Sequence, residues 1–171
     1  MILYTEYKDE LCLILVNENR VEHTVFGSHF TLYQKENSVV IQVVEDGVSY
    51  LLQHEQSCTI HGIQFTAIPL LQGWSQFKSY LYQDTIVIGT VMNDITVSTE
   101  LFDRNAITIH FDTKEIEVNS SIHAYMNQKR IQNVVYKAGD LLETYYLRIL
   151  FEEDFIIVNH PSNTSCHLSK F

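Results

Sequence analysis

The sequence predicts an all-β protein built from two β-sandwich domains in tandem. The dominant hydrophobic period along the 171 residues is two rather than 3.6. Short apolar segments rich in Val, Ile, Tyr, Phe and Thr alternate with turn-forming or charged residues at spacings of about 8–12 residues, which is typical of sandwiches and barrels. No stretch of ten or more residues has apolar residues at the spacing of a helical stripe.

The first half of the chain contains a regular series of strand candidates. Turn formers or charges such as Asn17-Glu-Asn-Arg20 separate them, and the step Asp46-Gly47 predicts a tight hairpin. The candidates are Ile2–Tyr7, Leu11–Val16, Val21–Phe26, Phe30–Tyr33, Val39–Val44, Val48–Leu52, Cys58–Ile60 and Ile63–Ile68.

The segment Pro69–Ser75 interrupts this pattern, because Pro69 and Gly73 bracket residues that do not alternate. We therefore expect a domain boundary between residues 72 and 73, which gives a shortened first domain, 1–72, and a fuller second domain, 73–171. The polar tail after Pro161 is expected to fray or to lead into a further segment.

The second half repeats the style of the first. Asp112-Thr-Lys114 is expected to form a hairpin turn, and the aromatic run from Tyr145 to Phe151 favours one continuous strand over a helix. The strand candidates are Ser79–Tyr82, Thr85–Ile88, Asp94–Val97, Ala106–Phe111, Glu115–Val118, Ile122–Tyr125, Ile131–Val135, Tyr145–Phe151 and Phe155–Val158.

Composition and charge exclude several classes of function. Lys and Arg number 11 against 21 Asp and Glu, so a net charge of −10 leaves no electrostatic footprint for nucleic acid or an anionic membrane. The longest uncharged apolar run, Leu11–Asn17, is too short to span a bilayer, and no basic segment opens the chain as in a signal peptide. Three widely spaced cysteines form no disulfide framework and favour a reducing compartment.

The sharpest enzymatic candidate is His54-x3-Cys58-x2-His61. A histidine beside Cys58 could generate a thiolate nucleophile, and the three side chains could also ligate zinc. A small thiol in a strand-like alternation is ordinarily inert, so a thiol enzyme using Cys58 and His61 is only an alternative. No phosphate-binding glycine loop, nucleophile elbow or metalloprotease motif is present, and neither a cofactor nor a metal is expected.

The segment Ile86–Ile95 carries the most information. A strand ends at Ile88-Gly89-Thr90, a short loop follows, and Asn93-Asp94-Ile95 opens the next strand. The order of short motifs resembles the forkhead-associated (FHA) domain, a β-sandwich that reads phosphothreonine. That family has Ile-Gly-Arg, Asp-Ile, Val-Ser-Arg-x-His, Asn-Gly and Gly-Asp, and the later positions correspond here to Phe102–Ala106, Met126-Asn127-Gln128 and Gly139-Asp140.

The departures from the family pattern fall on the positions whose side chains bind phosphate in that family. Thr90 stands where the family has its phosphate-binding arginine, and Asp103 stands where it has a phosphate-bonding serine. A threonine offers one neutral donor instead of a charged fork, and an aspartate repels a dianion. The resemblance therefore implies an FHA fold degenerate for phosphothreonine. The loop positions that it marks for partner contact are Gly89, Thr90, Asn93, Asp103, Arg104 and Asn127.

Two such modules in tandem resemble the N-terminal cytoplasmic region of the EssC/Yuk-type membrane ATPases of type VII secretion, relatives of the FtsK/SpoIIIE translocases. The resemblance implies a non-catalytic module that docks a protein of the secretion machinery or another copy of itself, attached to the membrane through segments outside this sequence. One alternative is a phosphopeptide-binding FHA adaptor that uses Arg104, Lys129 and Arg130. Another is a β-sandwich adaptor with no FHA ancestry.

Overall fold

A computed structural model describes residues 1–69, 78–81, 84–161 and 164–168 of the chain. The chain divides into two compact units, Met1–Leu70 and Leu71–Phe171. The predicted boundary between residues 72 and 73 lies outside the described residues, as does most of the predicted interruption. No helix in the described ranges is long and apolar enough to cross a membrane.

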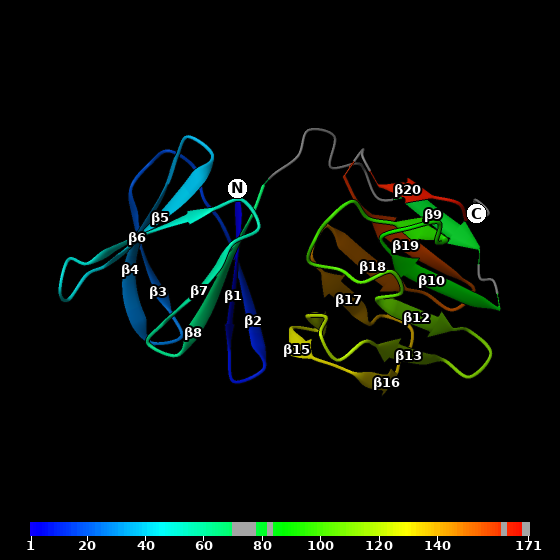
Figure 1. The fold of residues 1–171 in the computed structure, drawn as a ribbon. Helices are drawn as coiled ribbons and strands as arrows, with labels where there is room; N and C mark the ends of the chain where they lie inside the picture. Colours follow the sequence, from blue (N-terminus) through cyan, green and yellow to red (C-terminus); the bar gives the residue numbers. More distant parts are fainter. Residues whose placement is uncertain (70–77, 82–83, 162–163, 169–171) are drawn as a thin grey trace. The chain divides into compact units, whose positions relative to one another are not determined.

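Unit 1 consists of two antiparallel layers (Figure 1). One layer has the strand order β7-β8-β1-β2 and the other has the order β3-β4-β5-β6. Within each layer the strands that are consecutive in sequence pair with each other, and β1 also pairs with β8, which joins the two ends of the unit. The strands are β1 (Ile2–Tyr7), β2 (Glu10–Leu15), β3 (Val21–Val25), β4 (Ser28–Lys35), β5 (Ser38–Val43), β6 (Ser49–Gln53), β7 (Ser57–Ile60) and β8 (Ile63–Ile68).

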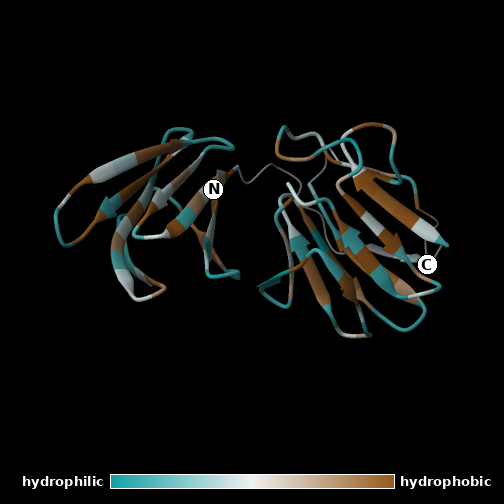
Figure 2. Cartoon of the chain, turned by 60° about the horizontal axis from the view of Figure 1, so that its bottom comes forward, coloured by the Kyte–Doolittle hydropathy of each residue, from teal (hydrophilic) through white to brown (hydrophobic). Residues whose placement is uncertain are grey.

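The core of unit 1 lies between these layers. Leu3 of β1 and Ile41 of β5 are both fully buried in one cluster, because alternate residues of each strand point inward. The rings of Phe30 and Phe65, one from each layer, meet edge to face with centroids 5.2 Å apart. Figure 2 shows hydrophobic and hydrophilic residues alternating along the strands, with mostly hydrophilic loops. The predicted sandwich is therefore present in this unit.

Unit 2 has the same two-layer plan with more strands. Its layers have the orders β16-β13-β12-β10-β11-β20 and β15-β14-β17-β18-β19-β9, and β10 and β11 run parallel. The strands are β9 (Lys78–Leu81), β10 (Thr85–Gly89), β11 (Ile95–Thr96), β12 (Ile107–His110), β13 (Glu115–Val118), β14 (Ala124–Met126), β15 (Lys129–Arg130), β16 (Asn133–Val135), β17 (Leu141–Thr144), β18 (Leu147–Phe151), β19 (Phe155–Asn159) and β20 (Ser165–Cys166).

Aromatic packing joins the layers of unit 2. Tyr136, which follows β16, stacks on Phe151 of β18 with ring centroids 4.1 Å apart, and Phe111 meets Tyr136 edge to face. Ile88 of β10 and Ile109 of β12, in the other layer from β18, are fully buried. The core thus fixes the end of β10, from which the candidate binding loops leave.

One predicted strand is wrong at its start. Residues 141–151 form a hairpin of β17 and β18, so Tyr145 and Tyr146 are in a turn and not in a strand. Tyr146 has a φ of 64°, which tyrosine seldom adopts, yet both side chains are at most 5% exposed. Burial of the two rings overrides the local preference for strand. The strand β17 itself was not predicted, and neither were β15 and β20, which are each two residues long.

The expectation that the tail frays after Pro161 is wrong for residues 164–168. Cys166 in β20 pairs with Ile95 of β11, and the backbone N–H of His167 donates to the carbonyl of Asp94 at 2.8 Å. Burial, with a hydrogen bond to Cys166, raises the pKa of Tyr80 in β9 to about 12. The tail therefore contacts both layers of unit 2 and closes the edge of β11.

Candidate functional site

The end of β10 is packed against the loop between β11 and β12. An ideal Cβ on Gly89 would overlap the carbonyl oxygen of Arg104 and Nδ2 of Asn93. The same Asn93 amide donates a hydrogen bond to the Arg104 carbonyl, so the β10–β11 and β11–β12 loops are joined. Only glycine leaves room for this approach, which explains why the sequence has Ile-Gly at this strand end.

Side-chain caps fix the base of the β10–β11 loop. Oδ2 of Asp94 accepts a hydrogen bond from the backbone N–H of Val87 at 2.8 Å, and Oγ1 of Thr96 accepts one from the N–H of Asn93 at 3.1 Å. The N–H of Val97 donates to the Gly89 carbonyl at 2.8 Å. The loop is thus held on both sides by short-range Asx and Thr bonds.

The tip of this loop is apolar and exposed. Val91 is 47% exposed, and Met92 is 95% exposed with a φ of 50°. A non-glycine residue in the left-handed region costs on the order of 1–3 kcal/mol, and such strain gathers at ligand clamps and binding sites. Val91 and Met92 are not among the loop positions that the FHA resemblance marks. The signal that was available is two apolar residues inside a turn-rich loop, between Gly-Thr and Asn-Asp.

Asp103 and Arg104 lie in the β11–β12 loop, and both are exposed. Oδ2 of Asp103 accepts a hydrogen bond from Oγ of Ser121 at 2.7 Å, and Ser121 Oγ also lies 3.1 Å from Oδ1 of Asn119. Because Asp103 and Arg104 are exposed neighbours in the chain, the loop presents one acidic and one basic side chain together. This pair could orient a polar partner, but it provides no concentrated positive charge for a dianion.

Asn127 has a structural role. With Gln128 it forms the two-residue turn between β14 and β15, and both residues have positive φ, of 51° and 70°. Its Nδ2 donates to Oδ1 of Asp140 at 2.9 Å, and its Oδ1 accepts from the N–H of Leu141 at 3.0 Å. Both polar atoms of the amide are therefore engaged with the start of β17.

The structure brings together Gly89, Asn93 and Arg104 by direct contact, with Thr90 next to Gly89 and Asp103 next to Arg104 in the chain. Asn127 makes its hydrogen bonds elsewhere, with residues 140 and 141. The two further basic residues considered for phosphate binding, Lys129 and Arg130, form β15 and lie in neither of the joined loops.

The surroundings of the thiol candidate in unit 1 disfavour a thiolate at Cys58. Cys58 packs at half burial against the core, and burial raises the pKa of its thiol, which lowers the thiolate fraction at neutral pH. The ring of His61 lies near Phe30, with centroids 6.0 Å apart. His54 pairs at 3.9 Å with Glu55. Among the described residues, no cluster of His, Cys, Asp or Glu could hold a metal ion.

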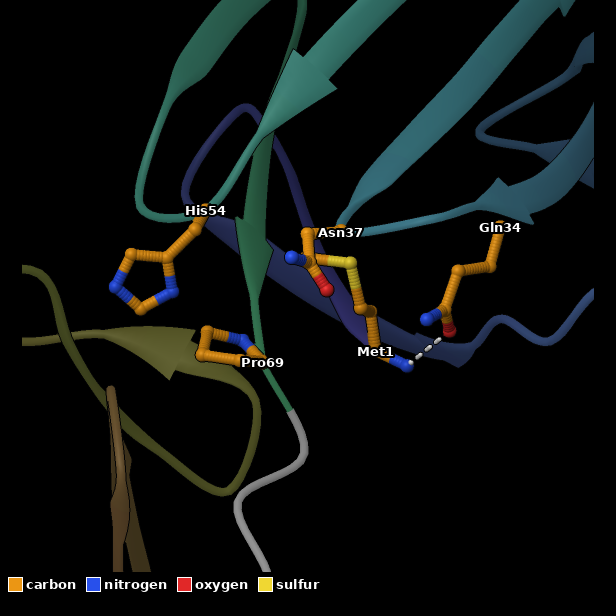
Figure 3. Close-up of a pocket in the computed structure, with 5 residues that line it drawn as sticks. All are labelled: Met1, Gln34, Asn37, His54 and Pro69. Atoms are coloured by element: carbon orange, nitrogen blue, oxygen red, sulfur yellow. Dashed lines mark hydrogen bonds between the residues drawn. The ribbon is translucent and has the colours of Figure 1, made fainter.

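His54 instead borders a hollow of about 440 Å³ in unit 1 with Met1, Gln34, Asn37 and Pro69 (Figure 3). The Met1 ammonium donates to the Val16 carbonyl and to Oε1 of Gln34, both at 3.0 Å, and burial lowers its pKa. These bonds tie β1 to the end of β2 and to β4. The ammonium is thus already engaged by protein acceptors.

Comparison with known proteins defines the fold. No protein-family model and no curated protein matches the chain. Among solved structures, however, the architecture is that of FHA sandwiches. The chain is similar to the N-terminal FHA domain from EssC, a component of the bacterial type VII secretion apparatus, with a TM-score of 0.68 and 17% identity over 99% of this chain and 96% of that chain. The FHA-2 domain from the Mycobacterium tuberculosis ABC transporter Rv1747 also matches, with a TM-score of 0.38 and 20% identity over 57% of this chain and 94% of that chain.

The fold prediction is therefore confirmed. The chain has an all-β FHA-like architecture, and its resemblance to the N-terminal region of EssC extends over nearly its whole length at the level of the fold.

Proposed function

We propose that the chain is a non-catalytic protein-interaction module of a type VII secretion apparatus, and that it docks its partner through the joined β10–β11 and β11–β12 loops. The observation that carries the proposal is the β10–β11 loop, whose base is fixed by hydrogen bonds while Met92 at its tip is strained and exposed. A rigid loop that holds an apolar side chain in water is expected where a partner covers that side chain.

Three features support loss of phosphothreonine binding. Thr90 offers no cation at the end of β10, and Asp103 adds a negative charge to the neighbouring loop. The amide of Asn127 already bonds to Asp140 and Leu141. A dianionic phosphate needs charged donors to offset its desolvation, and the joined loops supply only Arg104.

The setting of the proposal comes from the fold. In this proposal the chain is the cytoplasmic N-terminal region of an EssC/Yuk-type ATPase, attached to the membrane through parts of the protein outside these residues. Its partner is a further component of the secretion machinery or a second copy. Because the chain carries a net charge of −10, we expect the partner surface to be neutral or basic around an apolar pocket.

Site-specific photo-crosslinking tests this proposal. A photoreactive phenylalanine is placed at Met92 and, as a control, at Thr113 in the exposed β12–β13 turn, and each protein is mixed with purified cytoplasmic components of a type VII system. We expect one component to cross-link at position 92 and not at 113. Met92→Ser should weaken that interaction about tenfold or more, because a buried methionine contributes about 1.5–3 kcal/mol.

The phosphopeptide adaptor is the second candidate, because Arg104 is an exposed cation within the joined loops. Isothermal titration with phosphothreonine peptides distinguishes the two. If the chain has lost phosphothreonine binding, as we propose, the titration should give no heat of binding. Micromolar binding that is lost in Arg104→Ala would contradict it and establish the adaptor.

A further inference from the structure

A second feature of unit 2, separate from the loops, is the edge strand β16. It is the terminal strand of the layer β16-β13-β12-β10-β11-β20 and lies beside β13 (Figure 1). In the ranges that the structure describes, no strand pairs with its outer side.

The register shows which backbone groups point outward. The N–H of Val118 donates to the carbonyl of Gln132 at 2.7 Å, and the N–H of Tyr136 donates to the carbonyl of Lys114 at 2.9 Å. In an antiparallel pair, alternate residues turn both polar groups toward the partner strand. Residues 132, 134 and 136 therefore face β13, and the N–H and C=O groups of Asn133 and Val135 point away from the sheet.

Edge strands are usually protected against pairing by being very short or by carrying lysine, proline or a bulge. The sequence of β16 is Asn-Val-Val, which has neither lysine nor proline, and Val135 is 65% exposed. The strand is short, but it offers two outward residues that together form a donor–acceptor ladder for an incoming strand.

A shallow hollow of about 340 Å³ lies along this edge. Its lining residues come from β13 and β16, and they are Glu115, Ile116, Glu117, Asn133, Val134 and Val135. Glu115 pairs with Val135 and Glu117 with Asn133, so these four side chains share the solvent face of the layer, while Ile116 is fully buried on the other face. The Glu117 side chain is 62% exposed, and its carboxylate lies 3.6 Å from Nε2 of His110.

We propose that the free edge of β16 is a second docking surface, which accepts an extended basic segment of a partner protein as an added β-strand. The backbone groups of Asn133 and Val135 would pair with that segment, and Val135 would contact the aliphatic stems of its basic side chains on the shared face. A residue on the added strand lies two strand spacings, about 10 Å, from β13. A lysine or arginine side chain of that strand and the side chain of Glu115 or Glu117 together span this distance.

Charge decides between a foreign strand and a second copy. Pairing two β16 edges would leave both pairs of glutamates without a cation, three strand spacings or about 14 Å apart, between chains that each carry a net charge of −10. A segment with alternate Lys or Arg instead supplies the charge that complements these glutamates.

A designed peptide and an edge-blocking variant test the proposal. The probe is a fluorescein-labelled peptide of alternating Lys and Val, compared with a Glu-Val peptide and with a Lys-Val peptide interrupted by proline. The variant Val135→Pro removes the outward N–H, and no native ladder bond is lost because this N–H does not face β13. Val135→Thr keeps the N–H and serves as the matched control.

We expect the Lys-Val peptide to bind, with Val135→Pro weakening it at least tenfold at an unchanged melting temperature and Val135→Thr weakening it less. Glu115→Gln with Glu117→Gln should weaken binding of the peptide severalfold, and the amides of Asn133 and Val135 should gain hydrogen-exchange protection when the peptide is bound.

No binding of the Lys-Val peptide, equal binding of the Glu-Val peptide, or full binding by a folded Val135→Pro variant would overturn the proposal. A dimer in sedimentation that Val135→Pro dissociates would instead assign the edge to a second copy. None of these results depends on Met92, so they test the β16 edge independently of the proposed docking through the β10–β11 and β11–β12 loops.

Discussion

Substitution of Gly89 by alanine tests whether the end of β10 organises the candidate site. The added Cβ would overlap the Arg104 carbonyl oxygen, which is backbone, and Nδ2 of Asn93. Because the carbonyl cannot rotate away as a side chain would, either β10 or the β11–β12 loop has to move. Movement of the loop would also break the Asn93–Arg104 hydrogen bond that joins the two loops.

The expected cost follows from these two contacts. Overpacking a tight site costs about 1–3 kcal/mol. Loss of one hydrogen bond adds about 0.5–1.5 kcal/mol. We therefore expect Gly89→Ala to destabilise unit 2 by about 2–4 kcal/mol, which for a unit of about 100 residues lowers its melting temperature by at least about 8 °C.

Thermal unfolding followed by circular dichroism measures this shift, and only the transition of unit 2 should move. Thr90→Ala is the matched control, because it alters the next residue without adding an atom, and its melting temperature should change little. A Gly89→Ala protein that melts within 2 °C of the wild type would refute the close approach on which the site depends.

Three further predictions concern other parts of the molecule. Asn127→Ala should destabilise unit 2 by about 1–3 kcal/mol, because it loses two side-chain hydrogen bonds. Asn127→Gly should cost less than Asn127→Ala, because glycine tolerates the positive φ at this position. Equal stability of Asn127→Ala and the wild type would contradict the structural role of Asn127. Iodoacetamide at pH 7.5 should label exposed Cys12 before Cys58, because the raised pKa of Cys58 keeps its thiol protonated. The labelling of Cys58 should accelerate as the pH rises toward 9. Labelling of Cys58 as fast as Cys12 would instead support the hypothesis of a thiol enzyme. Truncation after Pro161 should lower the melting temperature of unit 2 by several degrees through loss of β20, and an unchanged melting temperature would show that the tail is dispensable.

Much of the strand pattern was predictable, because residues that alternate between core and solvent leave a period of two in the sequence. Val39 and Ile41 are fully buried in β5, whereas Ser38 and Gln42 on the opposite face are only partly buried. The β17–β18 turn was not predictable in this way, because Tyr145 and Tyr146 have high strand propensity and enter a turn only through tertiary burial. The strand β20 was missed because two polar residues carry no periodicity.

The candidate site shows a similar division. The pattern Gly89-Thr90…Asn93 correctly located a loop at a strand end, since glycine and Asx residues mark turns by their own backbone chemistry. The contact between Gly89 and Arg104 depends on residues far apart in sequence, so no local pattern reveals it. The exposure of Met92 was hidden for the opposite reason, because an apolar residue is normally assigned to the core.

The pairing of β20 with β11 also bears on how the protein folds. These strands are separated by about 70 residues of sequence, and β9 likewise pairs with a strand far along the chain, β19. Unit 2 therefore has to close long loops before its sheets are complete. During synthesis the hairpins of unit 1 and its β1–β8 closure are already available when the ribosome is still producing unit 2. We therefore expect unit 1 to fold first on the nascent chain, while unit 2 exposes the edge of β11 until its final strand is released.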